Sequence, residues 1–176
     1  MKKEIEIQLS KSNLLLMAIG ATGFVVMGIL FVIKPSNFQP HQQTLITTLG
    51  IVSILFFGAC LLFMVKKLFD NKAGLMIDEN GITDNSSGTS VGLIEWEDIT
   101  NIKTSQVGFA KFILIETTNP EKYISKAKNS ISTKAMRANH KTYGTPLSIS
   151  SNTLQIKFDE LLKVILQAYK TKQSFN

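Results

Sequence analysis

Two apolar stretches decide the architecture of this chain: LLLMAIGATGFVVMGILFVI at residues 14–33 and TLITTLGIVSILFFGACLLFMV at residues 44–65. Neither contains a charged residue or a histidine. Helices of 20 and 22 residues extend for roughly 30 Å, the thickness of the hydrocarbon core of a bilayer. We predict two transmembrane helices rather than core helices of a soluble protein, which would carry polar residues along one face. A cleaved signal peptide is disfavoured because KPSNF, not a small-residue cleavage site, follows the first stretch.

The segment between the stretches, residues 34–43 (KPSNFQPHQQ), is short enough to force an antiparallel hairpin with an external loop. It carries only Lys34, whereas lysines flank the other ends of the spans at positions 2, 3, 11, 66, 67 and 72. The positive-inside rule then predicts that both termini are cytoplasmic. Because neither span contains an ionisable group, transport through the hairpin is not expected.

The rest of the chain has the composition of one small soluble domain. Residues 66–176 contain fifteen Lys and Arg residues against eleven Asp and Glu residues, and the whole chain carries a net charge of +6. The single cysteine, Cys60, lies within the second span, so neither an intramolecular disulfide nor a cysteine-based metal site is expected. We predict a cytoplasmic N-terminal segment (1–13), a transmembrane hairpin (14–65) and a cytoplasmic domain (70–176).

Short apolar runs between turn residues predict an antiparallel sheet in this domain. Strands are expected at residues 75–77, 82–84, 91–96, 99–104, 112–117, 147–150 and 154–156. Asn80-Gly81 is the strongest hairpin signal among them, and Gly81 permits a positive φ in the turn. Trp96 is expected to fill the core.

Helices are predicted in the second half of the domain. Asn119 can cap and Pro120 can begin a helix, so we expect helices at 122–129 and 132–141, ending at Gly144. A C-terminal amphipathic helix is indicated by one apolar stripe, formed by Phe158, Leu161, Leu162, Ile165 and Tyr169. The predicted fold class is α+β: an antiparallel sheet or barrel with a C-terminal helix and a basic helical insertion at about 119–144.

Two sequence motifs in this domain are similar to those of a known type of domain. GLMIDENGI at residues 74–82, followed by IEWEDI at residues 94–99, resembles the pattern of bacterial PH-like domains, which often follow a pair of N-terminal membrane spans. The resemblance covers about residues 70–118 and, loosely, the final helix. It implies an uncharacterised family of bacterial two-span membrane proteins with a C-terminal PH-like domain, and hence a location in the bacterial inner membrane. It does not imply phosphoinositide binding, because the turn at residues 78–81 (DENG) is acidic where such binding needs a basic loop.

A search for catalytic groups yields no candidate. His41 and His140 have no second ligand at a metal-binding spacing, so neither a metal nor a cofactor is predicted. Glu95, Glu97 and Asp98 flank Trp96 without a nucleophile, and we interpret them as solvated charges at a strand end, with Asp98 capping a turn. The chain is therefore not expected to be an enzyme.

The basic insertion supplies the one candidate interaction site. No acidic residue lies between Lys122 and Lys141, and the residues expected to contact lipid headgroups or a partner are Lys126, Lys128, Lys134, Arg137 and Lys141. The alternative is that these residues only aid solubility. Nucleic acid is not expected, because aromatic residues for base stacking are too few. We expect a non-enzymatic binding or scaffolding protein that presents its domain to a protein partner, a second copy or anionic lipid. The alternative function is an enzyme, or an enzyme subunit, acting on a lipid or envelope precursor at the cytoplasmic face.

Overall fold

The computed structural model of the protein describes residues 4–174. These residues form two compact units. The first, the hairpin unit, comprises residues 11–71, and the second, the sheet domain, combines residues 4–10 with residues 72–174. Along the chain, the hairpin unit is therefore an insertion within the sheet domain.

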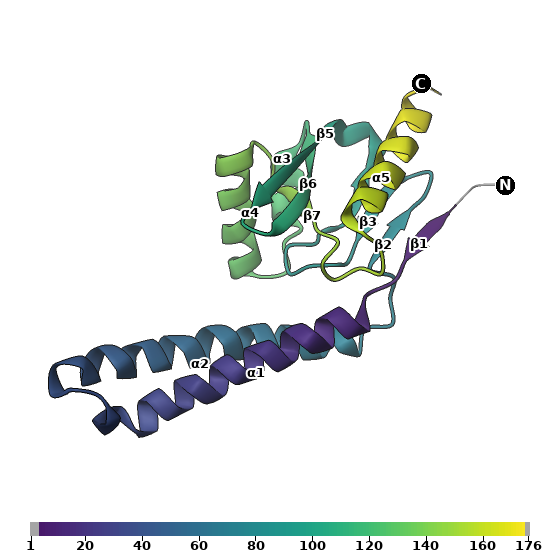
Figure 1. Cartoon of the computed structure of the whole chain (residues 1–176). Helices are drawn as coiled ribbons and strands as arrows, with labels where there is room; N and C mark the ends of the chain where they lie inside the picture. The colour runs from purple at the N-terminus through teal and green to yellow at the C-terminus, as the bar shows by residue number, and fades with distance from the viewer. Residues whose placement is uncertain (1–3, 175–176) are drawn as a thin grey trace. The chain divides into compact units, whose positions relative to one another are not determined.

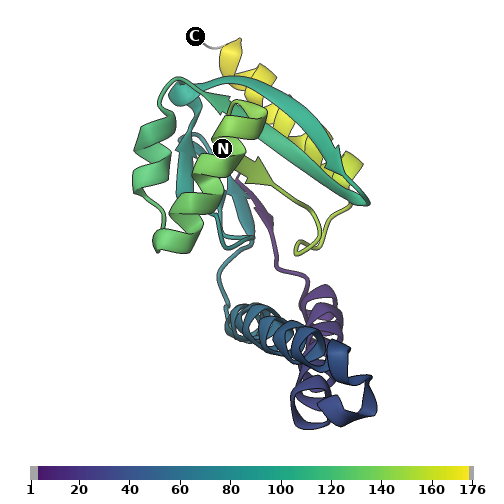
Figure 2. The same ribbon diagram turned by 90° about the vertical axis from the view of Figure 1, so that its left-hand side faces the viewer.

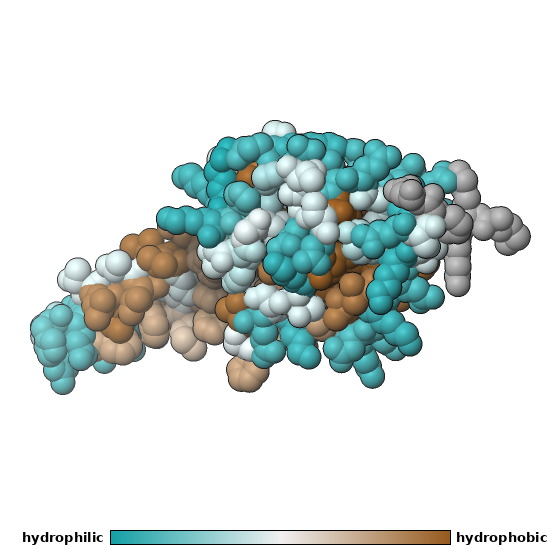
Figure 3. All heavy atoms as spheres, turned by 90° about the horizontal axis from the view of Figure 1, so that it is seen from above, coloured by the Kyte–Doolittle hydropathy of each residue, from teal (hydrophilic) through white to brown (hydrophobic). Residues whose placement is uncertain are grey.

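The hairpin unit consists of two long antiparallel helices, α1 (Lys11–Ile33) and α2 (Pro40–Leu68), joined by the short 3-10 helix η1 (Pro35–Asn37) (Figure 1). Both are long and apolar enough to cross a membrane. Only 17% and 6% of the residues in their most apolar windows are buried, whereas core helices of soluble proteins are mostly buried. Figure 3 shows apolar surface gathered over this unit. Pro40 begins α2, because the first helical position needs no N–H donor.

The two helices approach most closely at a pair of glycines. A Cβ atom on Gly28 would lie 2.9 Å from the carbonyl oxygen of Gly50, and one on Gly50 would lie 2.7 Å from that of Gly28. Nearby, Ser53 Oγ donates to the carbonyl of Phe24 at 3.1 Å, and the Phe24 ring stacks on that of Phe57. Because small residues let helix backbones approach, this contact sets the crossing point of the hairpin.

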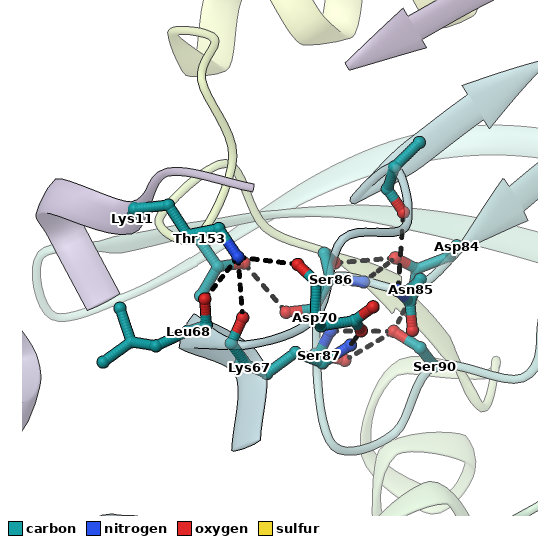
Figure 4. A network of polar contacts seen from close by, with 11 residues as sticks. Lys11, Lys67, Leu68, Asp70, Asp84, Asn85, Ser86, Ser87, Ser90 and Thr153 are labelled. Atoms are coloured by element: carbon teal, nitrogen blue, oxygen red, sulfur yellow. Dashed lines mark hydrogen bonds and ion pairs between the residues drawn. The ribbon is translucent and has the colours of Figure 1, made fainter. Parts of the chain in front are cut away.

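A lysine closes the open end of the hairpin unit. Lys11 Nζ donates to the carbonyl oxygens of Leu68 and Asp70, both at 2.6 Å, and to that of Lys67 at 3.3 Å (Figure 4). The last carbonyl groups of a helix have no partners within the helix, and a cation there also favours the helix dipole. The first residue of α1 thus caps the end of α2.

The sheet domain contains two antiparallel sheets. The first has the order β1-β2-β3-β4, and the second has the order β5-β6-β7. Between them lies the 3-10 helix η2 (Trp96–Asp98). The strands are β1 (Ile5–Ile7), β2 (Leu75–Ile77), β3 (Gly81–Asp84), β4 (Gly92–Glu95), β5 (Ile99–Val107), β6 (Ala110–Thr117) and β7 (Leu147–Ile149). Mixed α and β structure is thereby confirmed, as are six of the predicted strands.

Strand β1 is a feature that the sequence analysis missed. It precedes the hairpin unit and pairs with β2, which follows it, with Ile5 opposite Ile77 and Ile7 opposite Leu75. Gly74 extends this ladder by donating its N–H to the carbonyl of Ile7 at 2.9 Å. The predicted strand at 154–156 is wrong: Leu154 forms only an isolated bridge, with Leu9. The N-terminal segment therefore belongs to the sheet domain.

Three helices complete the sheet domain: α3 (Pro120–Ser125), α4 (Ser130–Tyr143) and α5 (Phe158–Gln173). Figure 1 shows α4 and α5 on opposite sides of the sheets. The predicted helix at 122–129 is too long, because Asn129 caps α4 by accepting the N–H of Ser132. Gly144 ends α4 with φ +79°, as predicted for a helix stop. Asn119 makes no capping hydrogen bond with its side chain.

The core of the sheet domain is formed by buried apolar residues from the strands of both sheets and from α3, α4 and α5. Leu161 and Ile165 of the predicted apolar stripe are fully buried, and the Tyr169 ring stacks on that of Trp96. Trp96 is 5% exposed, which confirms its predicted place. Gly81 does not adopt the positive φ that a glycine permits. Gly81 is needed because a Cβ atom there would lie 2.0 Å from the carbonyl oxygen of Ile94 in the neighbouring strand.

The turn between β3 and β4 is built around a buried carboxylate. Asp84 is 4% exposed, and its side chain accepts the hydroxyls of Ser86 and Ser90, both at 2.6 Å (Figure 4). The carbonyl of Ser86 accepts the hydroxyl of Thr153 at 2.9 Å. Buried polar groups are stable only when hydrogen-bonded, so this network holds the turn against the chain that precedes α5.

Candidate functional site

The helical insertion, residues 119–144, lies between β6 and β7 and packs on the sheet domain. Tyr123 and Met136 are both fully buried. Ser132 Oγ donates to the carbonyl of Gly88 at 2.8 Å, which joins the start of α4 to the β3–β4 turn. The insertion is therefore held in a defined position, with one side against the core and the other toward solvent.

Asp98 anchors the root of the insertion. It is 8% exposed, and its carboxylate accepts three side-chain hydrogen bonds. Asn119 Nδ2 donates to Oδ1 at 2.9 Å, and Lys122 Nζ and the Tyr123 hydroxyl donate to Oδ2 at 2.7 and 2.6 Å. The N–H of Thr118 donates to the Asp98 carbonyl at 3.1 Å. These contacts, which we call the Asp98 lock, tie η2 to the first turn of α3.

Charge-assisted hydrogen bonds fix the protonation states in the lock. The bonds from Lys122 and then Tyr123 lower the pKa of Asp98 from 3.8 to about 2, although burial acts in the opposite direction. Burial and the bond to Asp98 raise the pKa of Tyr123 to about 12. The bonds to Asp98 and Glu95 raise the pKa of Lys122. Asp98 is therefore an anion and Tyr123 a neutral donor at neutral pH, an arrangement suited to holding structure.

The lock corrects the interpretation of the acidic residues around Trp96. Asp98 is buried and paired, and Glu95 Oε2 accepts Lys122 Nζ at 2.7 Å, so neither is a freely solvated strand-end charge. Among the three acids only Glu97 is exposed. The prediction failed because the partners of Asp98 and Glu95 lie in the helical insertion. Strands β5 and β6 separate the two segments in the sequence, so these residues come into contact only in the folded domain.

The five predicted contact residues divide into two groups. Lys134, Arg137 and Lys141 are all exposed and follow one another at i, i+3 and i+7 along α4, so they form one stripe, the basic stripe. Lys128 is exposed in the connection before α4. Lys126 follows α3, and its Nζ lies over the Tyr123 ring, 5.1 Å from the ring centroid. The structure thus groups three of the predicted residues on one helix.

Members of the basic stripe differ in their partners. Arg137 donates two hydrogen bonds to the Glu121 carboxylate, each at 3.0 Å, so part of its charge is neutralised. In residues 4–174, neither Lys134 nor Lys141 forms an ion pair with an acidic side chain. These two lysines therefore present the strongest uncompensated positive charge on α4.

Ile131 is a member of this surface that the sequence analysis missed. It lies in the first turn of α4 and is 78% exposed. Ile131, Lys134 and Lys141 occur at i, i+3 and i+10, which places them on one side of the helix. The sequence does contain a signal for it: Ile131 is an apolar residue at a position of the helical pattern where a polar, solvent-facing residue is expected. The exposed side of α4 therefore combines apolar and positively charged groups.

The histidines are separated in the structure. His41 lies at the start of α2 in the hairpin unit, and His140 lies near the end of α4 in the sheet domain. His140 Nδ1 is buried without a hydrogen-bond partner. In the described part of the chain, no group of three or more His, Cys, Asp or Glu residues is placed to hold a metal ion.

A family model covers most of the chain. No curated protein and no solved structure matches the chain. A family model described as a family of unknown function (DUF5381) matches residues 3–158. This range includes the hairpin unit, every strand and the helical insertion, and it ends at the first residue of α5. The chain therefore belongs to the family of unknown function DUF5381.

Proposed function

We propose that this protein is a non-enzymatic binding module, anchored in a bacterial inner membrane by α1 and α2, whose α4 surface contacts anionic lipid headgroups. The observation that carries the proposal is the exposed side of α4, where Lys134 and Lys141 accompany Ile131 while Met136 on the other side is fully buried. Amphipathic helices with basic and apolar residues bind at the interface of anionic membranes.

The pairing of β1 with β2 supports a topology in which both ends of the hairpin unit lie on the same side of the membrane. These strands adjoin the two ends of the hairpin unit in sequence, and antiparallel pairing requires them to lie on the same side of any membrane that the hairpin crosses. This argument is independent of charge. The lysines that flank the same ends, such as Lys11, Lys66 and Lys67, then favour the cytoplasmic side.

We also propose that the sheet domain has a PH-like fold. Its two antiparallel sheets and its C-terminal helix α5 support this fold, as does the resemblance at residues 74–82 and 94–99. On this proposal, the hairpin unit is an insertion after the first strand, and residues 119–144 are a second insertion before the last strand.

Electrostatic energies indicate that α4 orients the domain. Each Lys or Arg near an anionic surface contributes about 1 kcal/mol. Lys134 and Lys141 would therefore contribute about 2 kcal/mol, which is weak for recruitment from solution. The membrane anchor makes the contact effectively intramolecular, and a weak contact is then sufficient to select one orientation.

The test measures the reactivity of lysine amines in the full-length protein. The protein is reconstituted in lipid nanodiscs containing either neutral lipid alone or neutral lipid with phosphatidylglycerol, and it is treated briefly with an amine-acylating reagent before mass spectrometry. We expect slower modification of Lys134 and Lys141 in anionic nanodiscs, with the difference lost at high salt because screening weakens the contact.

Lys163 provides the internal control. It is exposed on α5 and should react equally in both nanodiscs. Equal reactivity of Lys134 and Lys141 with and without anionic lipid would overturn the proposal. Protection that is the same in both nanodiscs but increases with protein density would indicate a second copy as the partner instead.

A further inference from the structure

The turn between β5 and β6 displays two apolar side chains to solvent. Phe109 is completely exposed, at 106%, and Val107 is 54% exposed. In the described part of the sheet domain, the large apolar residues with strong exposure are these two and Ile131. Two exposed apolar side chains at one tip indicate an interaction, because the rest of the domain exposes few large apolar side chains to solvent.

This tip is an ordered feature of the domain. The β5–β6 ladder continues to the pair Val107 and Ala110, so the turn has two residues. Gly108 adopts φ +57°, which only glycine adopts without strain, and Gln106 Nε2 donates to its carbonyl at 2.9 Å. In Figure 2 this hairpin is the long teal-green ribbon at the top of the domain, and its turn lies at the margin. Phe109 is therefore held outward by a defined turn.

The outer part of the hairpin, around the tip, contains no acidic residue. Residues 104–115 include Lys111 and no Asp or Glu, whereas nearer the base of the hairpin Lys103 pairs with Glu116 of β6 at 2.6 Å. Lys111 Nζ lies 4.0 Å from the Asp159 carboxylate and is half exposed. Acidic side chains at the tip would oppose insertion into an anionic membrane surface, and residues 104–115 carry none.

A lipid bilayer is a better candidate than a protein for the binding partner of this tip. A stable protein interface buries about 800 Å² on each partner, which one phenylalanine and one valine do not supply. An interfacial anchor needs only a few apolar groups, because the lipid accepts them without shape complementarity. The sheet domain follows directly in sequence from both ends of the hairpin unit, at Ser10 and at Lys72, so it is tethered to any membrane that α1 and α2 cross.

We propose that the β5–β6 turn is an interfacial anchor, with Phe109 and Val107 inserting at the boundary between headgroups and acyl chains of the bilayer that holds α1 and α2. The proposal rests on the membrane anchoring proposed above but not on the α4 contact. It adds an apolar contact on a different element of the sheet domain.

Tryptophan fluorescence of full-length F109W tests the proposal. The substitution keeps an aromatic ring at a fully exposed position, and the native Trp96, which is buried, supplies a background measured in the unsubstituted protein. The proteins are reconstituted in phosphatidylcholine–phosphatidylglycerol vesicles with and without lipids brominated on the acyl chains. We expect the F109W emission to shift to the blue and to be quenched by brominated lipid at least twofold more than the background.

Lys170→Trp is the matched control, because Lys170 is exposed near the end of α5, where the neighbouring Tyr169 contacts the carbonyls of Ile99 and Thr100 at the base of β5, far along the hairpin from the turn. Its added emission should match that of tryptophan in water and should not be quenched by brominated lipid. Water-like, unquenched emission from F109W would overturn the proposal. A blue shift without quenching by brominated lipid would also overturn it, since the partner would then be protein.

A second measurement separates this proposal from the α4 contact. The F109W variant is combined with K134Q and K141Q, which remove the two uncompensated charges of α4. Quenching that persists supports an independent anchor at the turn, even if the amine reactivity of α4 shows no lipid effect. Quenching that disappears with these charges would overturn the independent anchor.

Discussion

The hydroxyl of Tyr123 donates a hydrogen bond to Oδ2 of Asp98 at 2.6 Å, and both residues are buried: Tyr123 fully, and Asp98 with 8% of its surface exposed. This bond joins the end of the first sheet to the helical insertion. A buried anion without partners would be costly, so the lock determines whether the insertion can pack at all. The position of the basic stripe therefore depends on the Asp98 carboxylate, although Asp98 is not itself a member of the stripe.

We predict that Asp98→Asn destabilises the full-length protein by about 2 kcal/mol at pH 7. The pKa of Asp98 falls from 3.8 to about 2 on folding, so the anion stabilises the folded state above pH 4. This contribution disappears as the pH falls from about 4 to about 2, and the difference between the proteins should shrink over that range. Denaturant unfolding in detergent at several pH values measures it. Glu97→Gln, which changes the exposed neighbouring acid, is the control and should have little effect on stability. If the difference in unfolding free energy between the wild type and Asp98→Asn stays constant down to pH 2, the stabilising anion is not Asp98.

We predict that Gly81→Ala severely disrupts the first sheet. The added Cβ atom would lie 2.0 Å from the carbonyl oxygen of Ile94, and a backbone atom cannot move away as a flexible side chain can. We expect a loss of at least about 3 kcal/mol, at the upper end of the range for overpacking. Gly58→Ala is the control, because no atom lies within 4 Å of its added Cβ. Equal thermal unfolding of the two variants would show that β3 and β4 are not paired in this register.

We predict that a fragment containing only residues 70–176 does not fold stably. It lacks β1 and also Ile7 and Leu9, which are 7% and 2% exposed. Burying each such side chain contributes roughly 1.5–3 kcal/mol, a large part of the stability of a small domain. A chain in which a Gly-Ser linker replaces residues 11–71 should fold, because it restores the pairing of β1 with β2.

Amide hydrogen exchange compares these two proteins. We expect protected amides in β2 of the linked chain and rapid exchange throughout the fragment. Equal protection of β2 in both would mean that β1 adds nothing to the domain.

We predict that Gly28→Ala weakens the packing of the hairpin. The Cβ atom would lie 2.9 Å from the carbonyl oxygen of Gly50, so the helices would have to separate. Gly20→Ala on the same helix meets no atom within 4 Å and should be neutral. Thermal unfolding of the full-length proteins in detergent, followed by circular dichroism of the helices, compares the two variants. A lower midpoint for G28A than for G20A is expected, and equal midpoints would argue against the glycine contact.

Some elements were predictable because their signals are local. The two apolar helices follow from the composition of residues 14–33 and 44–65, and α5 follows from a stripe with helical spacing. The candidate site was predictable only in part. The charge of the insertion and the spacing of Lys134, Arg137 and Lys141 are in the sequence, but the pairing of Arg137 with Glu121 and the exposure of Ile131 depend on how α3 and α4 pack.

The sequence by itself determined the two apolar helices, most of the strands and the basic character of the insertion, because hydrophobicity, turn residues and charge act over a few neighbouring residues. Only the tertiary structure decided that Ile5–Ile7 is a strand, that Gly28 meets Gly50 and that Asp98 holds Tyr123. Each of these depends on residues far apart in the chain. A three-residue strand or a single buried carboxylate is stable only when its distant partner supplies the hydrogen bonds, and no local pattern records that partner.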